Sequence, residues 1–539
     1  YALATAQRSF YTSPVKALVN EKFFSLCRDF GAERVGLITG DAKVNATASI
    51  ICCTAEILAN MALKEGADCP VHDIVMDEFH YYSDRDRGTA WQIPLLTLSN
   101  SRFLLMSATF GETDFFRDSL TKLNKKETVV VSSTERPVPL HFQYSEQPIE
   151  ETLQDIIALD KAPVYVVHFT QRDAATLAQS LMSFNFSSKE NKKKIAEEIN
   201  KVRFTSPYGK EISKYLRHGI GLHHAGILPK YRILTEQLAQ KGLLKIICGT
   251  DTLGVGVNIP IRSVLLTKMC KYDGKKTSLL TIRDFNQICG RAGRKGFDDE
   301  GHVYVQAPEH VIENKKLERK AKIAGKKKKF VKAKAPERGY VPWDENTYKK
   351  YLESPPETLR SSFNVSHALI INTLSGDRDG CGAMRDLFKK IHESTASKNY
   401  LRTQGFLILR SLIDKKIIEI IPKHEQVDSK LRLNFDLQDN FSLTEPLSLF
   451  LLDIVKYLDP MDEKYDLNLL SLIESIIENP EIILRKQLDK VKQEKMQEMK
   501  SEGVDFEDRV SALEDLEHPK PMREFLYENF NGFSEKYPW

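Results

Sequence analysis

The 539-residue chain has few cysteines, no long apolar run and no phosphate-loop motif. None of its eight cysteines forms a C-x-x-C pair, which argues against a zinc site or a disulfide framework and fits a reducing cytoplasm. No stretch approaches the roughly 18 apolar residues of a membrane span, so we expect no membrane partner. No segment reads G-x-x-x-x-G-K-S/T, since the nearest match at Gly274 has Met269 in place of the first glycine.

The charge is unevenly distributed along the chain. The net charge is +4, but residues 314–334 carry 11 Lys or Arg against one Glu, a local +10. The rest of the chain therefore carries a net charge of about −6, which is +4 minus +10. Such a segment is typical either of a solvated, disordered linker or of an arm that binds an anionic partner such as nucleic acid, and the two are compatible.

Apolar runs alternate with amphipathic helical stretches through the first 310 residues, the pattern of parallel α/β sheets. Strands are expected at Ser9–Thr12, Val35–Thr39, Ile50–Cys53, Asp73–Met76, Phe103–Met106 and Thr128–Ser132, then at Val164–Phe169, Gly219–Leu222, Leu244–Cys248, Ser263–Lys268 and His302–Gln306. Polar motifs follow these strands, where open parallel sheets bind their ligands. The fold class is therefore α/β, with two tandem parallel-sheet domains and a mainly helical C-terminal region.

Five segments are expected from this pattern and from the length, which is too great for a single core. They are an ATP-binding domain at 1–140, a second α/β domain at 141–310, a basic linker at 311–342, a helical module at 343–425 and a helical C-terminal region at 426–539. Helices are expected at Leu359–Leu374, Met384–Glu393 and Tyr400–Lys415, followed by a short strand at Ile417–Pro422. Helices closed by a small β element suggest a winged helix.

Asp77-Glu78-Phe79-His80 directly follows an expected strand. A single carboxylate at a strand end suffices for Mg²⁺, which keeps most of its waters, so Asp77 is the candidate metal residue. Glu78 would orient or deprotonate the attacking water. His80 would couple this box to Gln287 or to Ser107-Ala108-Thr109, the candidate coupling residues at the end of another strand.

Gln287-Ile288-Cys289-Gly290-Arg291-Ala292-Gly293-Arg294 places two arginines three positions apart. We expect a helix that Gln287 opens and that carries both arginines toward the γ-phosphate of ATP. A guanidinium is always charged and binds phosphate in a fork. Arg294 would act as an arginine finger and Arg291 as its partner on the phosphates. The glycines of Thr250–Pro260 allow close backbone approach, and Gly256 and Asn258 are the candidates there for contact with the nucleotide.

Donor-rich motifs at other strand ends could position a sugar-phosphate chain without reading its sequence. Ser13-Pro14-Val15-Lys16 opens a helix, and a helix N-terminus with one lysine makes a phosphate site. The candidate nucleic-acid residues are Ser13, Pro14, Lys16, Thr39, Gly40, Asp41, Thr54, Thr170, His224 and Thr250. A zinc site at His223-His224 is not expected, because adjacent side chains point apart and no third ligand is evident.

Taken together, these motifs resemble those of DExH-box superfamily 2 helicases of the Ski-like group. The resemblance rests on Tyr11–Phe23, on Asp77–His80 with Ser83-Asp84-Arg85-Asp86-Arg87-Gly88, and on His223–Gly226, Thr250–Pro260 and Gln287–Arg294. It extends from Tyr1 to about Gln306, and the part after Asn346 resembles more loosely a bacterial branch of these helicases. The family implies two RecA-like domains, ATP-driven 3′-to-5′ translocation and a single-stranded or 3′-tailed nucleic acid as partner. The S-P-x-K-A-L and D-R-D-R-G strings look closer to the RNA-acting members of the group, and this resemblance favours RNA over DNA.

The family needs a phosphate loop upstream of Ser13, and its absence makes us expect an internal fragment of a longer helicase. The missing strand would lie inside the first sheet and leave its neighbours unpaired. We expect no ATP turnover from the fragment alone. Two alternatives remain: a non-catalytic nucleic-acid-binding scaffold that has lost its phosphate loop, and a double-strand translocase that does not separate strands.

Overall fold

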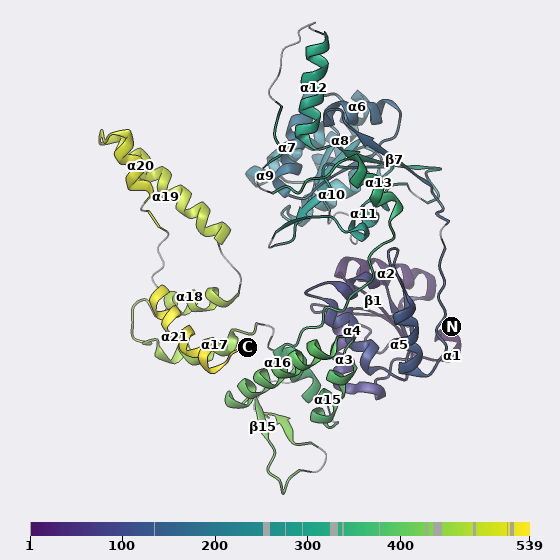
Figure 1. The fold of residues 1–539 in the computed structure, drawn as a ribbon, viewed down its shortest axis with the longest axis vertical. Helices are drawn as coiled ribbons and strands as arrows, with labels where there is room; N and C mark the ends of the chain where they lie inside the picture. Colours follow the sequence, from purple (N-terminus) through teal and green to yellow (C-terminus); the bar gives the residue numbers. More distant parts are fainter. Residues whose placement is uncertain are drawn as a thin grey trace. The chain divides into compact units, whose positions relative to one another are not determined.

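The computed structural model describes the chain except for residues 1, 134, 252–258, 275, 294, 324–331, 337–338, 377, 427–428, 435–442, 444, 478–480, 515 and 518–521. The chain forms two compact units. Unit 1 comprises Tyr1–Leu58, Pro70–Trp91 and Leu98–Ser362, and unit 2 comprises Ala59–Cys69, Gln92–Thr97 and Phe363–Trp539. Figure 1 shows the ribbon of both units.

The first sheet of unit 1 has the strand order β3-β2-β4-β1-β5-β6. Its strands are β1 (Ser9–Ser13), β2 (Val35–Ile38), β3 (Lys43–Val44), β4 (Ile50–Thr54), β5 (Asp73–Met76) and β6 (Arg102–Leu105). All neighbours pair in parallel except β3, which runs antiparallel to β2. The helix α2 (Lys16–Phe30) packs on β1, β2 and β4, and α3 (Ala55–Glu65), α4 (Gly88–Thr97) and α5 (Asp114–Asn124) follow β4, β5 and β6.

The second sheet, also in unit 1, is entirely parallel, with the order β7-β14-β11-β8-β10-β9. Its strands are β7 (Leu140–Ser145), β8 (Val164–His168), β9 (Ile220–His223), β10 (Ile246–Thr250), β11 (Ser263–Leu266) and β14 (Gly301–Gln306). Five of these, all but β7, are buried along their whole length, as expected for strands covered on both faces. The surrounding helices are α6 (Ile149–Ala158), α7 (Gln171–Ser180), α8 (Lys189–Ile199), α9 (Pro207–Arg217), α10 (Pro229–Gln240) and α11 (Ile282–Cys289). The prediction of two tandem parallel-sheet domains is confirmed.

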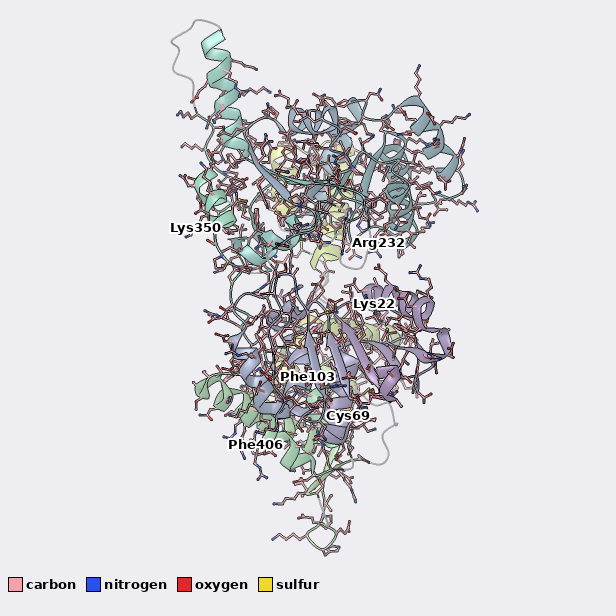
Figure 2. The ribbon with its side chains drawn as sticks, turned by 90° about the vertical axis from the view of Figure 1, so that its right-hand side faces the viewer. Lys22, Cys69, Phe103, Arg232, Lys350 and Phe406 are labelled. Atoms are coloured by element: carbon pink, nitrogen blue, oxygen red, sulfur yellow. The ribbon has the colours of Figure 1, made fainter. Side chains whose placement is uncertain are left out.

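Two predictions for the first sheet are wrong, one of a strand and one of a gap between strands. Thr128–Ser132 forms no strand, and its Val129 and Val131 are 72% and 93% exposed, because β-branched composition does not create pairing where nothing covers the side chains. The expected gap inside the first sheet is also absent, since its strands are contiguous from β3 to β6. β6 forms one edge of the sheet, where it pairs only with β5 and leaves Leu104 54% exposed. Figure 2 labels Phe103, the β6 residue that precedes it.

Unit 1 ends with two further helices, α12 (Glu309–Ile323) and α13 (Glu345–Glu353). The basic segment that composition predicts to be a linker is therefore helical as far as Ile323. Its exposed cations include Lys316, Arg319 and Lys320, and the run from 324 to 331 lies outside the described residues. A hairpin of β12 (Cys270–Tyr272) and β13 (Thr277–Leu279), which was not predicted, precedes α11.

Unit 2 is mainly helical, as predicted. It contains α14 (His367–Leu374), α15 (Gly380–Lys390), α16 (Thr395–Asp414), the hairpin β15 (Ile418–Ile420) and β16 (Leu431–Leu433), then α17 (Ser448–Ile454), α18 (Tyr465–Ile477), α19 (Glu481–Ser501), α20 (Phe506–Glu514) and α21 (Arg523–Lys536). The helix expected from Leu359 begins at His367, because the Ser366 hydroxyl caps it by accepting from Leu369 N at 3.2 Å. Among the described residues no helix is long and apolar enough to span a membrane.

Candidate functional site

The candidate residues of the first domain lie at the carboxyl ends of neighbouring strands. Ser13 ends β1, Thr39–Asp41 follows β2, Thr54 ends β4, Asp77 follows β5 and Ser107 lies just beyond β6. Because the strand order is β2-β4-β1-β5-β6, the nucleic-acid candidates occupy one half of this edge and the catalytic candidates occupy the other. This edge is where open parallel sheets bind ligands.

Three hydrogen bonds hold Asp77: its carboxylate accepts two from neutral donors, and its backbone N–H donates the third. Its Oδ2 accepts from the Tyr11 hydroxyl, and its Oδ1 accepts from Glu78 N at 3.0 Å. Its own N–H donates to Thr12 O at 2.9 Å, which fixes the residue to β1. Burial, and then the hydrogen bond to Asp77, raise the pKa of Tyr11, so the phenol stays protonated as a donor. Among the described residues Asp77 forms no ion pair, and a fixed carboxylate of this kind fits Mg²⁺, which takes few protein ligands.

Glu78 adopts a left-handed backbone conformation, with φ 57° and ψ 46°, which costs a non-glycine residue some strain. The next residue anchors this turn, because Phe79 N donates to Met106 O at 2.8 Å and the Phe79 ring is fully buried. That ring packs against Phe110 and Phe116, with centroids 5.4 and 5.2 Å away. Burial, and then the negative charge of Asp77, raise the pKa of Glu78, while the charge of Arg291 opposes the rise. A carboxylate of raised pKa is the better proton acceptor.

His80 bridges Glu78 and the candidate coupling residues. Its Nδ1 lies 3.3 Å from Glu78 Oε2 and 3.4 Å from Ser107 Oγ. Burial, and then the charge of Arg283, lower the pKa of His80 to about 4. The imidazole is therefore neutral at pH 7, so its contact with Glu78 is not an ion pair.

The Ser107-Ala108-Thr109 segment connects the first domain to the second within unit 1. Thr109 N donates to Ser107 Oγ at 3.3 Å, and Thr109 Oγ1 accepts from Gln287 Nε2 at 3.2 Å. Arg283 Nε donates to Thr109 O at 3.3 Å. Ala108 is exposed and has no polar side-chain atom for this chemistry. Two side chains of α11 thus contact the loop that also contacts His80.

The helix α11 differs from the prediction. It begins at Ile282 with a capping box between Thr281 and Asp284, and it ends at Cys289. Gln287 therefore lies in its last turn rather than at its start, and Arg291 lies in the loop beyond it. The cause is the glycine pair: Gly290 ends the helix, and Gly293 has φ +78° in a place where a Cβ would meet Val138 Cγ1 at 2.6 Å.

Arg291 provides a half-buried cation near the carboxylates. Its Nε has no hydrogen-bond partner among the described residues. Burial lowers the pKa of Arg291, and the nearby Tyr165, Glu78 and Asp251 oppose the change. A buried donor left unsatisfied is costly, and a phosphate oxygen would satisfy it. Arg294, Gly256 and Asn258 lie outside the described residues.

Arg136, which no sequence motif identified, supports the loop that carries Arg291. Arg136 Nη2 donates to Gly290 O at 2.8 Å and to Ala292 O at 2.9 Å. Its Nε donates to Val138 O at 2.8 Å, which ties the start of the second domain to the same loop. Arg136 thereby fixes the backbone on both sides of Arg291.

The first-domain nucleic-acid candidates form a polar cluster at the start of α2. Lys16 Nζ lies 2.9 Å from Asp41 Oδ1, which also accepts from Thr39 Oγ1 at 2.9 Å. The hydrogen bond from Lys16 lowers the pKa of Asp41. The Ser13 hydroxyl is buried without a partner among the described residues, and no side chain caps α2. Free amides at a helix start are donors for phosphate.

The remaining first-domain candidates have structural contacts of their own. The Pro14 carbonyl accepts from the Arg87 guanidinium, so the D-R-D-R-G string supports the loop before α2. Gly40 lies beside Lys16, because a Cβ there would be 3.9 Å from Lys16 Nζ. Thr54 is nearly buried at the end of β4.

The second-domain candidates lie at the ends of β8, β9 and β10. Thr170 caps α7 by accepting from Asp173 N at 3.0 Å, and the Thr250 carbonyl accepts from the Tyr165 hydroxyl. His224 Nε2 lies 2.9 Å from Tyr208 Oη, its Nδ1 is buried without a partner, and burial lowers its pKa to about 4. Among the described residues no group of three His, Cys, Asp or Glu is placed to hold a metal ion.

A strap between α13 and unit 2, residues 355–362, is the main functional feature that the sequence analysis missed. The Glu357 carboxylate accepts from Ile282 N at 2.6 Å and from Arg283 N at 3.1 Å, which caps α11. Arg283 donates in turn to the Glu357 carbonyl. Farther along the strap, Arg360 N donates to Ser83 Oγ at 2.8 Å, and Ser362 Oγ donates to Ser83 O at 3.1 Å. The strap thus joins α11 to the segment that follows His80.

Replacing Glu357 with alanine should weaken the coupling between the domains. The change removes the acceptor of two amides at the start of α11, and losing a helix cap costs about 1 kcal/mol. We expect a several-fold smaller stimulation of ATP hydrolysis by nucleic acid in the whole protein, with an unchanged KM for ATP.

Steady-state ATPase assays with and without nucleic acid measure this ratio. Glu353→Ala, which alters the exposed end of α13 instead, is the matched control. Equal stimulation in the two variants would show that the strap does not position α11.

Models of three protein families match consecutive parts of the chain. A DEXQ-box helicase domain of Suv3 matches residues 1–116, a helicase conserved C-terminal domain matches 151–296, and a domain of unknown function (DUF3516) matches 307–539. The first two matches cover the two parallel-sheet domains.

Several curated proteins are similar in sequence to this chain. An uncharacterized helicase, C17H9.02, of Schizosaccharomyces pombe is 28% identical over 69% of the chain and 38% of its own length. The exosome RNA helicase MTR4 of Mus musculus is 29% identical over 57% and 36%, and the probable helicase HelY of Mycobacterium leprae is 31% identical over 56% and 40%. The matched region therefore spans about two fifths or less of the length of these relatives.

Proposed function

We propose that this chain, which belongs to the Ski-like group of superfamily 2 helicases, forms the motor domains of an ATP-dependent RNA helicase. The observation that carries the proposal is the convergence in unit 1 of Asp77, Glu78 and the unsatisfied guanidinium of Arg291. These groups are a metal ligand, a base and a phosphate-binding cation. ATP is the substrate and Mg²⁺ the metal ion.

Each residue has a distinct part in this proposal. Asp77 would hold Mg²⁺, which neutralises phosphate charge during phosphoryl transfer. Glu78 would orient the attacking water and accept its proton, and Arg291 would donate to the phosphate oxygens as negative charge develops. His80, Ser107, Thr109 and Gln287 would report the state of this site to the second domain through the contacts described above.

RNA is the substrate that the relatives favour, because MTR4 is described as an exosome RNA helicase. The nucleic-acid candidates at the ends of β1, β2, β4, β8, β9 and β10 offer hydroxyls, a lysine and helix amides, which suit a sugar-phosphate backbone. We propose a single-stranded or 3′-tailed strand that contacts both domains.

Strand displacement by the whole protein tests the function. With ATP and Mg²⁺, a 3′-tailed RNA duplex should be separated faster than a DNA duplex of the same sequence, and a blunt duplex should not be separated. ATP turnover stimulated by the duplex without strand separation would favour a double-strand translocase. Faster separation of the DNA would reverse the choice of substrate.

A second candidate is a nucleic-acid-binding scaffold without ATPase activity. The 539 residues of this chain contain no G-x-x-x-x-G-K-S/T loop, which a helicase needs for ATP. Binding of RNA by the whole protein with no nucleotide-dependent change in affinity, and no phosphate release, would establish the scaffold and reject the helicase.

The exposed cations of α12 are expected to contact phosphates. Replacing Lys316, Arg319 and Lys320 with glutamine should flatten the dependence of log affinity on log salt by up to about two units, at roughly 0.7 per lost contact with single-stranded RNA. Fluorescence anisotropy with labelled RNA at several salt concentrations measures the slope. Lys192, Lys193 and Lys194 of α8 provide a matched triple-glutamine control. An unchanged slope in the α12 variant would assign this helix a connecting role.

A further inference from the structure

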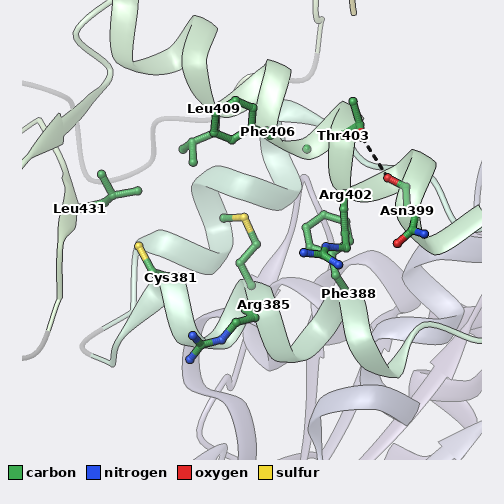
Figure 3. Close-up of a pocket in the computed structure, with 11 residues that line it drawn as sticks. Cys381, Arg385, Phe388, Asn399, Arg402, Thr403, Phe406, Leu409 and Leu431 are labelled. Carbon is green, nitrogen blue, oxygen red and sulfur yellow. Dashed lines mark hydrogen bonds between the residues drawn. The ribbon is translucent and has the colours of Figure 1, made fainter. Parts of the chain in front are cut away.

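Unit 2 contains a groove between α15, α16 and β16. Its volume is about 590 Å³, and Figure 3 shows the side chains that line it. The lining residues are Cys381, Met384, Arg385 and Phe388 of α15, Asn399, Arg402, Thr403, Gly405, Phe406 and Leu409 of α16, and Leu431 of β16. None of them has a part in the site proposed for ATP.

The floor and the mouth of the groove differ in chemistry. Met384, Phe388 and Gly405 are buried, and a Cβ on Gly405 would meet Phe388 Cζ at 2.7 Å, so glycine lets the two helices approach closely. Arg385 and Arg402 are exposed, and the Phe406 ring is 60% exposed. The groove therefore has an apolar floor, with a free aromatic ring and two guanidinium groups at its mouth.

The two arginines have no counter-ion in this groove. Neither forms an ion pair or a side-chain hydrogen bond among the residues that the structure describes, and no Asp or Glu lines the groove. The acids closest to Arg385 in sequence are engaged elsewhere: Asp379 caps α15 by accepting from Cys381 N at 3.1 Å, and Asp386 lies 3.7 Å from Lys389 Nζ. Two unpaired guanidinium groups at one groove attract an anion.

We propose that this groove is a second binding site for single-stranded nucleic acid. A base would stack on Phe406 over the apolar floor, and Arg385 and Arg402 would contact the flanking phosphates. Aromatic rings combined with cations are the general means of holding single strands without sequence preference. The choice of nucleic acid rests on the proposed function.

The surface of α16 favours a nucleic acid over an acidic peptide. Asn399, Arg402 and Thr403 of α16 line the same groove as Phe406, so an amide, a guanidinium and a hydroxyl accompany the exposed ring. Thr403 Oγ1 donates to Asn399 O at 3.1 Å, which leaves its lone pairs available to accept from a sugar hydroxyl. An amphipathic peptide helix would instead need a continuous hydrophobic groove, whereas two guanidinium groups, an amide and a hydroxyl line this one.

Binding of a labelled 20-residue oligouridylate to the full chain, measured by fluorescence anisotropy, tests the site. The double variant Arg402→Gln/Phe406→Ala should bind about tenfold more weakly, because it loses one stacking partner and one phosphate contact. The matched control is Arg523→Gln/Tyr527→Ala on α21, where the guanidinium lies 5.8 Å from the ring centroid. The control should retain wild-type affinity.

The outcomes separate this inference from the proposed function. Wild-type affinity in the groove variant would overturn the groove alone, whereas absence of binding by the unmodified chain would overturn both. Polyglutamate of matched charge should compete poorly, since it has no ring to stack, and equal competition would reject the nucleic-acid assignment. A second readout is the alkylation rate of Cys381, which bound oligouridylate should lower in the wild type but not in the double variant.

Discussion

Replacing Glu78 with glutamine in the whole protein is expected to abolish nucleic-acid-stimulated ATP hydrolysis while leaving ATP binding intact. The amide cannot accept a proton from water, and general-base catalysis contributes about 10²- to 10⁴-fold to a rate. Glutamine keeps the length of the side chain and a polar oxygen near His80 Nδ1, so the neighbouring contacts should persist. The raised pKa of Glu78, caused first by burial and then by Asp77, makes the carboxylate the better base.

Two measurements check this expectation. Phosphate release should fall by at least a hundredfold, and the affinity for a fluorescent ATP analogue should change less than twofold, because the base acts after the nucleotide has bound. Glu112→Gln, an exposed carboxylate in the same domain, is the matched control. Turnover that survives in the Glu78 variant would show that another group activates the water.

Most strands of the two large sheets could be predicted from the sequence. β5 was expected at Asp73–Met76 and forms there, because a continuous apolar run ends in charged residues at the edge of a buried parallel sheet. β7 was missed, since Leu140–Ser145 has partly exposed residues and no such run. Thr128–Ser132 was wrongly predicted as a strand, because it has β-branched composition but its side chains are not buried.

The candidate site likewise contains residues that could be found from the sequence and residues that could not. The Asp77–His80 box could be found because its residues are adjacent in the chain and follow a strand. Glu357 could not be found, because its bond to Ile282 N spans 75 positions and belongs to no motif. The helix was expected to begin at Gln287, but the Thr281 cap starts it earlier and Gly290 ends it. Gln287 therefore lies in the last turn of α11.

Replacing Arg291 with lysine should lower the turnover number as strongly as the change at Glu78, though by a different route. Lysine keeps the charge but loses the fork that binds two phosphate oxygens at once. An arginine that stabilises the transition state contributes about 10³- to 10⁵-fold to the rate of phosphoryl transfer. Because this stabilisation is greatest in the transition state, the KM for ATP should change far less than the kcat.

The folded state should tolerate this change, which makes the kinetic result interpretable. Arg291 is half-buried and its buried Nε has no partner among the described residues, so in the absence of nucleotide it contributes little to stability, and the variant should melt within a few degrees of the wild type. Arg217→Lys, on the exposed end of α9, is the matched control and should keep full activity. A large rise in KM with an unchanged kcat would make Arg291 a ground-state contact with the nucleotide. Equal kcat in both variants would exclude Arg291 from the reaction and leave Arg294 as the candidate finger.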